Sequence, residues 1–393
     1  MSKSRYAAAL AAITFSAAIG AFGQEEAAQG VLDELFDQPV SDTVVSDTGI
    51  DHTDIYGPDE RLVFGGYFRA LGGAIAGYRD WPSLDDLSDN FDLGAGVVAE
   101  TVVSIDARPS SIASIHGSFG TKFDPASEFN WGKFNILELY GDYILADAMF
   151  FRVGQFESVW GQGRIFNPGN LMDDSDDSFT IRAAFPAFLK GVTTYAFGSG
   201  DVQSTEDLSY AAKMDLLVLD TYLSGGLLYR YADGYAGLWS IKKVILGADL
   251  FSDVVVRYSA ADELSCEGIA GFFKEWDRLR LYGEYYVAAT ESGLSDQKLG
   301  LALGVKDIFK TKIDFAMKWE QSLDDGSGIW IGGITWSPLK YITANIGLPV
   351  VYGDVGTYYV DTGYVDTEDE DLEVGLDGYR VGLIVTLLMK ISF

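Results

Sequence analysis

The sequence predicts an all-β fold, a transmembrane antiparallel up-and-down β-barrel of about 18 strands, with about 16 strands as the alternative. Three features indicate it. Many segments alternate apolar and polar residues with a period of two, the last segment is unusually long, and short and long connections alternate along the chain. Beyond the N-terminal region, no segment supplies eighteen uninterrupted apolar residues, so helical membrane crossing is not expected.

The final segment, residues 378–393, has the clearest pattern. Its interleaved residues are more polar, while every second residue is apolar: Tyr379, Val381, Leu383, Val385, Leu387, Met389, Ile391 and Phe393. This period places one face of a strand in an apolar medium and the other in a wetter one. Such a long apolar row would promote aggregation at the edge of a soluble sheet. In a membrane, lipid solvates the row and barrel closure removes the edge.

Residues 134–146, 277–290 and 311–322 repeat this alternation. In a membrane barrel the apolar face of each strand contacts lipid and the polar face contacts the lumen. The residues expected to line the pore are Arg152, Arg182, Arg257, Glu284, Lys318 and Glu320.

The connections favour a barrel over a β-sandwich. Tight connections are expected after the even-numbered strands, at 108–110, 147–148, 186–187, 249–252, 307–310 and 337–340. The long connections follow odd-numbered strands, at 79–90, 124–133, 161–177, 199–206 and 352–377. Short periplasmic turns alternating with longer external loops are typical of outer-membrane barrels. Keeping this order along the chain requires a strand at residues 178–185.

The C-terminal residues resemble the C-terminal signature of bacterial outer-membrane β-barrels, in which alternating hydrophobic residues end on a Phe. Met389, Ile391 and Phe393 carry the resemblance. It implies that these residues form an assembly signal read by the barrel-assembly machinery. It also implies residence in the outer membrane of a Gram-negative-type envelope, in contact with outer-membrane lipid.

The chain divides into three predicted parts. Residues 1–23 have a basic start, a short apolar run and a small-x-small exit, which predict a signal peptide. Residues 24–60 carry eleven acids and one His and are expected to form an acidic periplasmic extension, which alternatively enters the barrel mouth. Residues 61–393 are assigned to the barrel.

A folded loop is expected after the fifth predicted strand. Residues 160–163 read Trp-Gly-Gln-Gly and residues 166–169 read Phe-Asn-Pro-Gly, a composition that favours turns. This is similar to a W-G-x-G…N-P pattern of porin-like outer-membrane proteins. One interpretation is a loop that folds inward and constricts the channel; the other is a structured surface loop. The constriction residues would be Trp160, Asn167, Asp173, Asp174, Asp176 and Asp177.

The formal net charge of −30 argues against nucleic-acid partners, because phosphate contacts require clustered Lys and Arg. Acids crowd the expected external loops, where their oxygens are candidate ligands for divalent cations that bridge to surface lipid. The run at 173–177 lacks the Gly and distal Glu of an EF-hand loop. No metal site and no cofactor is predicted.

His116 and Ser118 are similar to the His-x-Ser pair of an outer-membrane phospholipase family. In that family the pair faces lipid, where the substrate is. Here Ile115 and Phe119 occupy the lipid face, so the pair is expected in the lumen. The sequence contains no phosphate-binding Gly loop or nucleophile elbow, and no enzymatic activity is predicted.

The sequence therefore predicts a porin-like channel that admits small polar solutes by passive diffusion through a water-filled barrel. The alternative is a surface-binding or anchoring barrel, an adhesin or glycan-binding protein whose lumen is closed.

Overall fold

The computed structural model describes residues 62–78, 91–123, 134–146, 148–172, 178–186, 191–198, 207–261, 263–361 and 380–393. The predicted signal peptide (1–23) and acidic extension (24–60) lie outside the described residues. So do four of the predicted constriction residues, Asp173, Asp174, Asp176 and Asp177.

The described residues form 18 strands, as the sequence predicts. They are β1 (Leu62–Tyr78), β2 (Phe91–Ser110), β3 (Ala113–Phe123), β4 (Phe134–Leu145), β5 (Met149–Gln155), β6 (Phe179–Ala184), β7 (Val192–Gly198), β8 (Ser209–Val218), β9 (Thr221–Arg230), β10 (Gly234–Ile245), β11 (Ala248–Tyr258), β12 (Leu264–Trp276), β13 (Leu279–Thr290), β14 (Gly293–Val305), β15 (Ile313–Ser322), β16 (Gly328–Leu339), β17 (Ile342–Tyr352) and β18 (Val381–Ser392). The alternative of 16 strands is wrong, and β6 is the strand that the order of connections requires.

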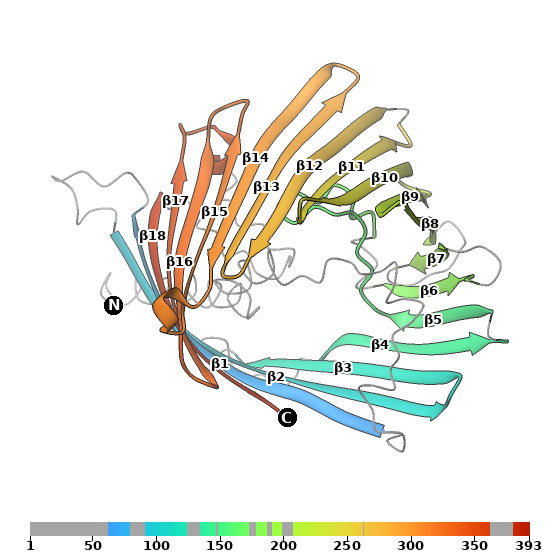
Figure 1. The fold of residues 1–393 in the computed structure, drawn as a ribbon, viewed down its shortest axis with the longest axis horizontal. Helices are drawn as coiled ribbons and strands as arrows, with labels where there is room; N and C mark the ends of the chain where they lie inside the picture. The colour runs from blue at the N-terminus through green and yellow to red at the C-terminus, as the bar shows by residue number, and fades with distance from the viewer. Residues whose placement is uncertain are drawn as a thin grey trace, which may run out of the picture.

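The strands close into a ring (Figure 1). Each strand pairs antiparallel with its neighbours in sequence, and β1 pairs with both β2 and β18. The ring therefore has no free edge, and the backbone groups of each strand are paired without help from solvent.

The seam between β1 and β18 depends on a glycine. The backbone N–H of Phe393 donates to the carbonyl of Gly66 over 3.0 Å, and the N–H of Gly66 returns a bond of 3.1 Å. Gly66 has a φ of 154°. A Cβ at this position would collide with the carbonyl oxygen of Val102 and lie 3.1 Å from the Phe393 ring. The last residue of the chain thus closes the barrel against a position that only glycine fits.

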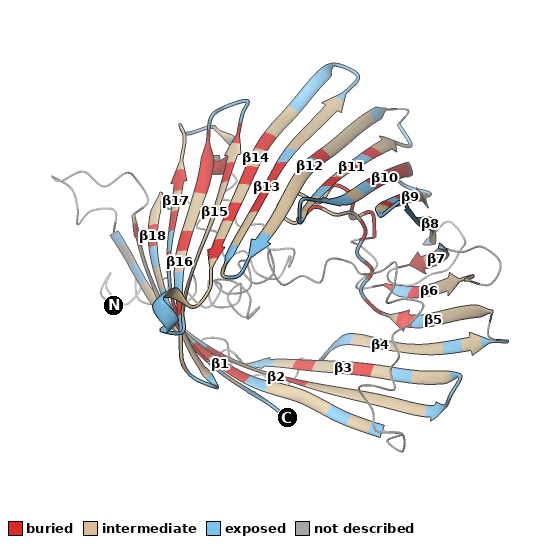
Figure 2. Ribbon diagram, in the orientation of Figure 1, coloured by how far each residue is buried: buried red, intermediate tan, exposed pale blue. Residues whose placement is uncertain are grey.

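The two faces of the sheet differ as predicted. Figure 2 shows buried positions recurring between exposed and intermediate ones along the strands. On β18 the inward residues Gly382, Thr386 and Leu388 are buried. Six of the eight residues of the predicted apolar row are exposed, Leu383, Val385, Leu387, Met389, Ile391 and Phe393; Val381 is half-buried, and Tyr379 lies outside the described residues. An apolar outer face on a closed sheet suits a lipid bilayer.

The connections follow the predicted order, with three errors in position. Residues 108–110 belong to β2 and residues 337–339 to β16, so these two turns come slightly later, at 111–112 and 340–341. The sequence places the turn after β10 at residues 249–252, and this prediction is wrong because those residues belong to β11. Leu246 and Gly247 make the turn, with φ of 54° and 71°. Two successive positive φ values match the twist of a two-residue hairpin, and Gly247 was the sequence signal for it.

No helix among the described residues is long and apolar enough to cross a membrane.

The outward assignment of β18 predicts a difference between two neighbouring substitutions. Val385→Arg places a cation on the lipid face near mid-strand and should lower the free energy of unfolding by about 2–4 kcal/mol. Ile384→Arg, the matched control, points into the barrel and should cost clearly less. Equal losses, measured by urea unfolding in lipid vesicles, would mean that the two faces are assigned wrongly.

Candidate functional site

The segment that follows β5 lies inside the barrel. In Figure 1 the green trace after β5 leaves the wall and runs across the ring towards β10, β11 and β12. Its described part, residues 156–172, is called the inner loop below. Hydrogen bonds and packing attach the inner loop to inward side chains of strands β7 to β14, on the far side of the ring from β1 and β2.

The strongest attachment is the carboxylate of Glu284, in the middle of β13. It accepts three consecutive backbone N–H groups of the inner loop, from Arg164 at 2.7 Å, Ile165 at 3.1 Å and Phe166 at 2.7 Å. The hydroxyl of Tyr282 donates to the same carboxylate. Glu284 is only 2% exposed, so these donors replace the water that a carboxylate normally binds.

Asp253 on β11 holds the preceding turn of the inner loop. Its Oδ2 accepts the N–H of Gln162 over 2.5 Å, and its Oδ1 accepts the hydroxyl of Ser240 on β10. The side chain is fully buried. Asp253 and Glu284 both extend from the wall to backbone N–H groups, so the fixed partners on the loop side are main chain.

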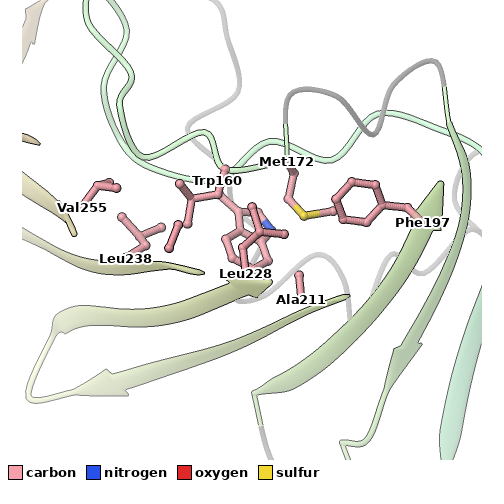
Figure 3. Packing of buried hydrophobic residues seen from close by; sticks show 9 residues of the cluster. Trp160, Met172, Phe197, Ala211, Leu228, Leu238 and Val255 are labelled. Atoms are coloured by element: carbon pink, nitrogen blue, oxygen red, sulfur yellow. The ribbon is translucent and has the colours of Figure 1, made fainter. Parts of the chain in front are cut away.

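Trp160 anchors the inner loop by packing. It is 1% exposed, and Figure 3 shows it among apolar side chains of β7 to β11 together with Met172 from the end of the loop. The buried cluster consists of Trp160, Leu171, Met172, Phe197, Ala211, Leu228, Ala236, Leu238 and Val255. Gly226 leaves the room for the indole, because a Cβ there would lie 2.5 Å from the Trp160 ring.

Two arginines of the wall hold the second half of the inner loop. Arg257 on β11 donates from Nη2 to the carbonyl of Pro168 over 3.2 Å, and Arg230 on β9 donates to the carbonyl of Leu171 over 3.3 Å. Wall carboxylates thus accept hydrogen bonds from N–H groups in the first half of the loop. Wall guanidinium groups donate hydrogen bonds to carbonyls in its second half. This pattern satisfies backbone that has no sheet partner inside the barrel.

The predicted pore-lining residues face inward but fall into different environments. Arg152 and Arg182 are directly paired in register on β5 and β6. Arg152 also forms two hydrogen bonds to Asp142, at 2.8 and 3.2 Å, and its guanidinium lies 4.1 Å from the ring centre of Tyr140. The guanidinium of Arg152 also lies 5.4 Å from the ring centre of Phe156, the first residue of the inner loop, so these two arginines lie beside the start of the loop.

The other four predicted residues make structural contacts. Arg257 also pairs with Glu267 over 3.2 Å. Lys318 pairs with Glu320 over 2.5 Å, and Glu320 is 2% exposed. Glu284 and Glu320 are therefore covered inward residues and do not present open carboxylates to a solute.

A second segment turns inward at the external end. Tyr359, in the short helix α3 (Tyr358–Asp361), is 1% exposed and donates its hydroxyl to Glu320 over 3.0 Å. Asp325, in the connection between β15 and β16, accepts the N–H of Tyr358 over 2.7 Å. Burial opposes ionisation, but hydrogen bonds from Tyr358 and Ser327 outweigh it and lower the pKa of Asp325 to about 2. This contact therefore stabilises the segment above a pH of ~4 and is lost as the pH falls towards about 2.

His116 lies on the inward face of β3, as predicted. Its Nδ1 lies 2.6 Å from Asp106 and its Nε2 lies 3.2 Å from Glu138. Tyr140 stacks on the ring with centroids 5.0 Å apart. Both ring nitrogens thus face carboxylates and not Ser118, which fits a polar wall network better than a hydrolytic pair.

Several residues that hold the inner loop were not singled out from the sequence. Asp253 is the main one, and its signal was a lone acid within the run Leu-Phe-Ser-Asp-Val-Val-Val of β11. An inward acid among apolar neighbours needs a partner, and here the partner is the inner loop. Within the described residues, no group of three or more His, Cys, Asp or Glu side chains is arranged to hold a metal ion.

Known structures of similar fold are porins. The chain is similar to a BenF-like porin from Pseudomonas fluorescens Pf-5, with a TM-score of 0.51, 8% sequence identity, and 85% of this chain and 99% of that chain covered. OccK11 (OpdR) of Pseudomonas aeruginosa gives a TM-score of 0.48 at 9% identity, with 84% and 96% covered. OmpF of Salmonella typhi gives 0.46 at 12% identity, with 84% and 97% covered. No protein-family model and no curated protein matches the sequence.

The first of these similarities shows the fold alone. Together with the closed 18-stranded sheet, it gives the protein the fold of a porin-like β-barrel, and the apolar outer face of that barrel suits a lipid bilayer.

The contacts of Glu284 predict how firmly the inner loop is held. Glu284→Ala removes the acceptor of three backbone N–H groups, and hydrogen bonds to a charged group contribute about 1.5–3 kcal/mol each. Hydrogen exchange of the amides at 164–166 should therefore accelerate by at least about tenfold. Glu275→Ala, a wall carboxylate with no contact to the inner loop, should leave these amides unchanged. Unaltered exchange in Glu284→Ala would show that the loop is held by other contacts.

Proposed function

We propose that this barrel is a channel through which small polar solutes diffuse passively across the outer membrane. The observation that carries the proposal is the inner loop, which is fixed inside the ring by Glu284, Asp253 and Trp160. A barrel of about 18 strands is wide enough for an aqueous lumen, and a loop fixed part of the way along it limits the size of what passes.

The proposed selectivity comes from opposed charges at this level. In this proposal the inner loop forms one side of the constriction. Its described part contains Trp160 and Asn167, and Asp173, Asp174, Asp176 and Asp177 follow in the sequence. The proposed basic residues are Arg152 and Arg182 on β5 and β6, beside the start of the loop, together with Arg257 on β11 and Lys318 on β15. Opposite charges across a narrow passage orient polar solutes and set a preference for one sign of ion.

A second candidate is an anchoring or surface-binding barrel with a closed lumen. The inward segment with Tyr359 favours it, because this segment packs on Glu320, Ile329 and Val351 at the external end and adds a second obstruction. In that case the acidic external loops, with divalent cations as partners, would carry the function. Neither candidate requires catalysis or a cofactor.

Conductance separates the two candidates. Purified protein in a planar lipid bilayer should give discrete single-channel openings, and neutral sugars of increasing size should reduce the current until they no longer enter. Glu284→Ala should give larger or noisier openings because the inner loop is released. A barrel that stays silent, both as wild type and as Glu284→Ala, contradicts the channel and supports the anchor.

The acidic residues of the loop predict ion preference. Replacing Asp173, Asp174, Asp176 and Asp177 by Asn should shift the permeability ratio from cations towards anions. The shift should be larger at 0.1 M salt, where the Debye length is about 10 Å, than at 1 M, where it is about 3 Å. A ratio that is unchanged at low salt would place these four residues outside the pore.

Met389, Ile391 and Phe393 are proposed to act as the signal for the barrel-assembly machinery. Phe393 supports this because it is exposed and outward and also completes the seam with Gly66. Deleting Phe393 should lower the amount of protein in the outer membrane and increase its periplasmic degradation, as measured by fractionation. Molecules that do insert should conduct normally. Wild-type insertion of the deletion variant would remove the assembly role.

A further inference from the structure

The first strand, β1, begins at the periplasmic end of the barrel. β18 ends opposite Gly66, whereas the pairing of β1 with β2 continues down to Leu62 and Ala107. Leu62 therefore lies beyond the end of β18. It is eight residues past Ala70, which stands in register with Met389 and Ile342 beside the turn that joins β16 and β17. In the sequence, residues 24–60 precede Leu62.

The periplasmic turns in this part of the barrel are basic, although the chain as a whole has a formal charge of −30. Between β10 and β17 the turns and the strand ends before them, residues 243–248, 274–278, 306–312 and 340–341, carry seven cations and three acids, the latter being Glu275, Asp277 and Asp307. We call the seven cations the basic rim: Lys243, Lys274, Arg278, Lys306, Lys310, Lys312 and Lys340. The external connections of the same strands, residues 259–263, 291–292 and 323–327, contain five acids and no Lys or Arg. Among these turns and connections, positive charge is thus found only at the end where β1 begins.

The lysines of the rim differ from those of the lumen in their partners. Lys213, Lys298 and Lys318 inside the barrel pair with Asp215 at 3.4 Å, Asp296 at 2.9 Å and Glu320 at 2.5 Å. Four rim lysines, Lys243, Lys310, Lys312 and Lys340, are exposed, and within the described part of the chain they form no ion pair. The four exposed rim lysines can therefore form ion pairs with an acidic segment, whereas the lumen lysines are already paired with carboxylates.

We propose that the acidic extension, residues 24–60, docks on the basic rim. The extension contains eleven acids and no Lys or Arg, so the charges of the two surfaces are complementary. The proposal concerns an interaction surface and does not depend on whether the barrel conducts.

The extension is long enough to reach the rim without entering the barrel. A flexible chain of 37 residues spans roughly 35 Å on average. The rim begins at Lys340, two strand pairs from β1, and neighbouring strands lie about 4.8 Å apart along their hydrogen bonds. Along the strands Lys340 is about six residues, or roughly 20 Å, from the level of Leu62. The nearest rim lysines, Lys340, Lys312 and Lys310, therefore lie within easy reach.

The docking can be tested by zero-length cross-linking of the intact protein. A water-soluble carbodiimide joins carboxylates to lysine amines that are in contact, and mass spectrometry identifies the joined peptides. In neutral detergent, cross-links are expected between the extension and Lys310, Lys312 and Lys340. The triple variant Lys310→Gln, Lys312→Gln, Lys340→Gln should lose roughly tenfold of the total cross-linked extension, the change expected for three exposed ion pairs. Lys122→Gln, at the external end of β3, is the matched control and should change nothing.

Three results would overturn the proposal. Cross-links to Lys213, Lys298 or Lys318 would place the extension in the lumen. Absence of any cross-link from the extension in the folded wild-type barrel would leave the rim without this occupant. Cross-links that form in detergent but disappear in bilayers containing anionic lipid would assign the rim to lipid headgroups. Persistence of the rim cross-links in such bilayers, with a several-fold decrease from 0.1 M to 1 M salt, supports docking.

Discussion

Lipid offers no hydrogen-bond partners to a polypeptide, so every strand edge in the membrane must be paired with another strand. The ring of 18 strands meets this constraint only because its first and last strands join. The join involves the last residue of the chain, whose N–H and carbonyl both bond to Gly66. The alternation of side chains, the apolar outer row and the position of each turn follow from that closed geometry, because a shift by one residue would turn every apolar side chain inward.

Inside the ring, the backbone of the inner loop needs hydrogen-bond partners that no strand provides. Side chains of the wall act as hydrogen-bond partners for these backbone groups. Glu284 and Asp253 accept N–H groups, and Arg230 and Arg257 donate to carbonyls. Each of these charged groups is costly to bury without its partner, so loop and wall stabilise each other. Trp160 adds apolar contact area to this polar frame.

The sequence was sufficient for the barrel and for part of the site. Alternation with a period of two and the order of the connections predicted 18 strands, because both are local properties that lipid imposes on each strand separately. The weak strand β6 was recovered from the order of connections alone. The partners of the inner loop could not be predicted, because Asp253 and Glu284 lie 91 and 118–120 residues away from the atoms that they bind. The misplaced turn after β10 has a simpler cause: two positive φ values at Leu246 and Gly247 were not recognised.

The hydrogen bonds of Glu284 fix the backbone of the inner loop through main-chain groups. The carboxylate contacts main-chain N–H groups of residues 164–166, which are present whatever side chains those residues carry. This polar attachment therefore does not depend on the side chains at these three positions, provided that none is proline, although Ile165 and Phe166 also pack on the wall. The course of the loop backbone is thus set by a wall residue more than 100 positions away in the chain.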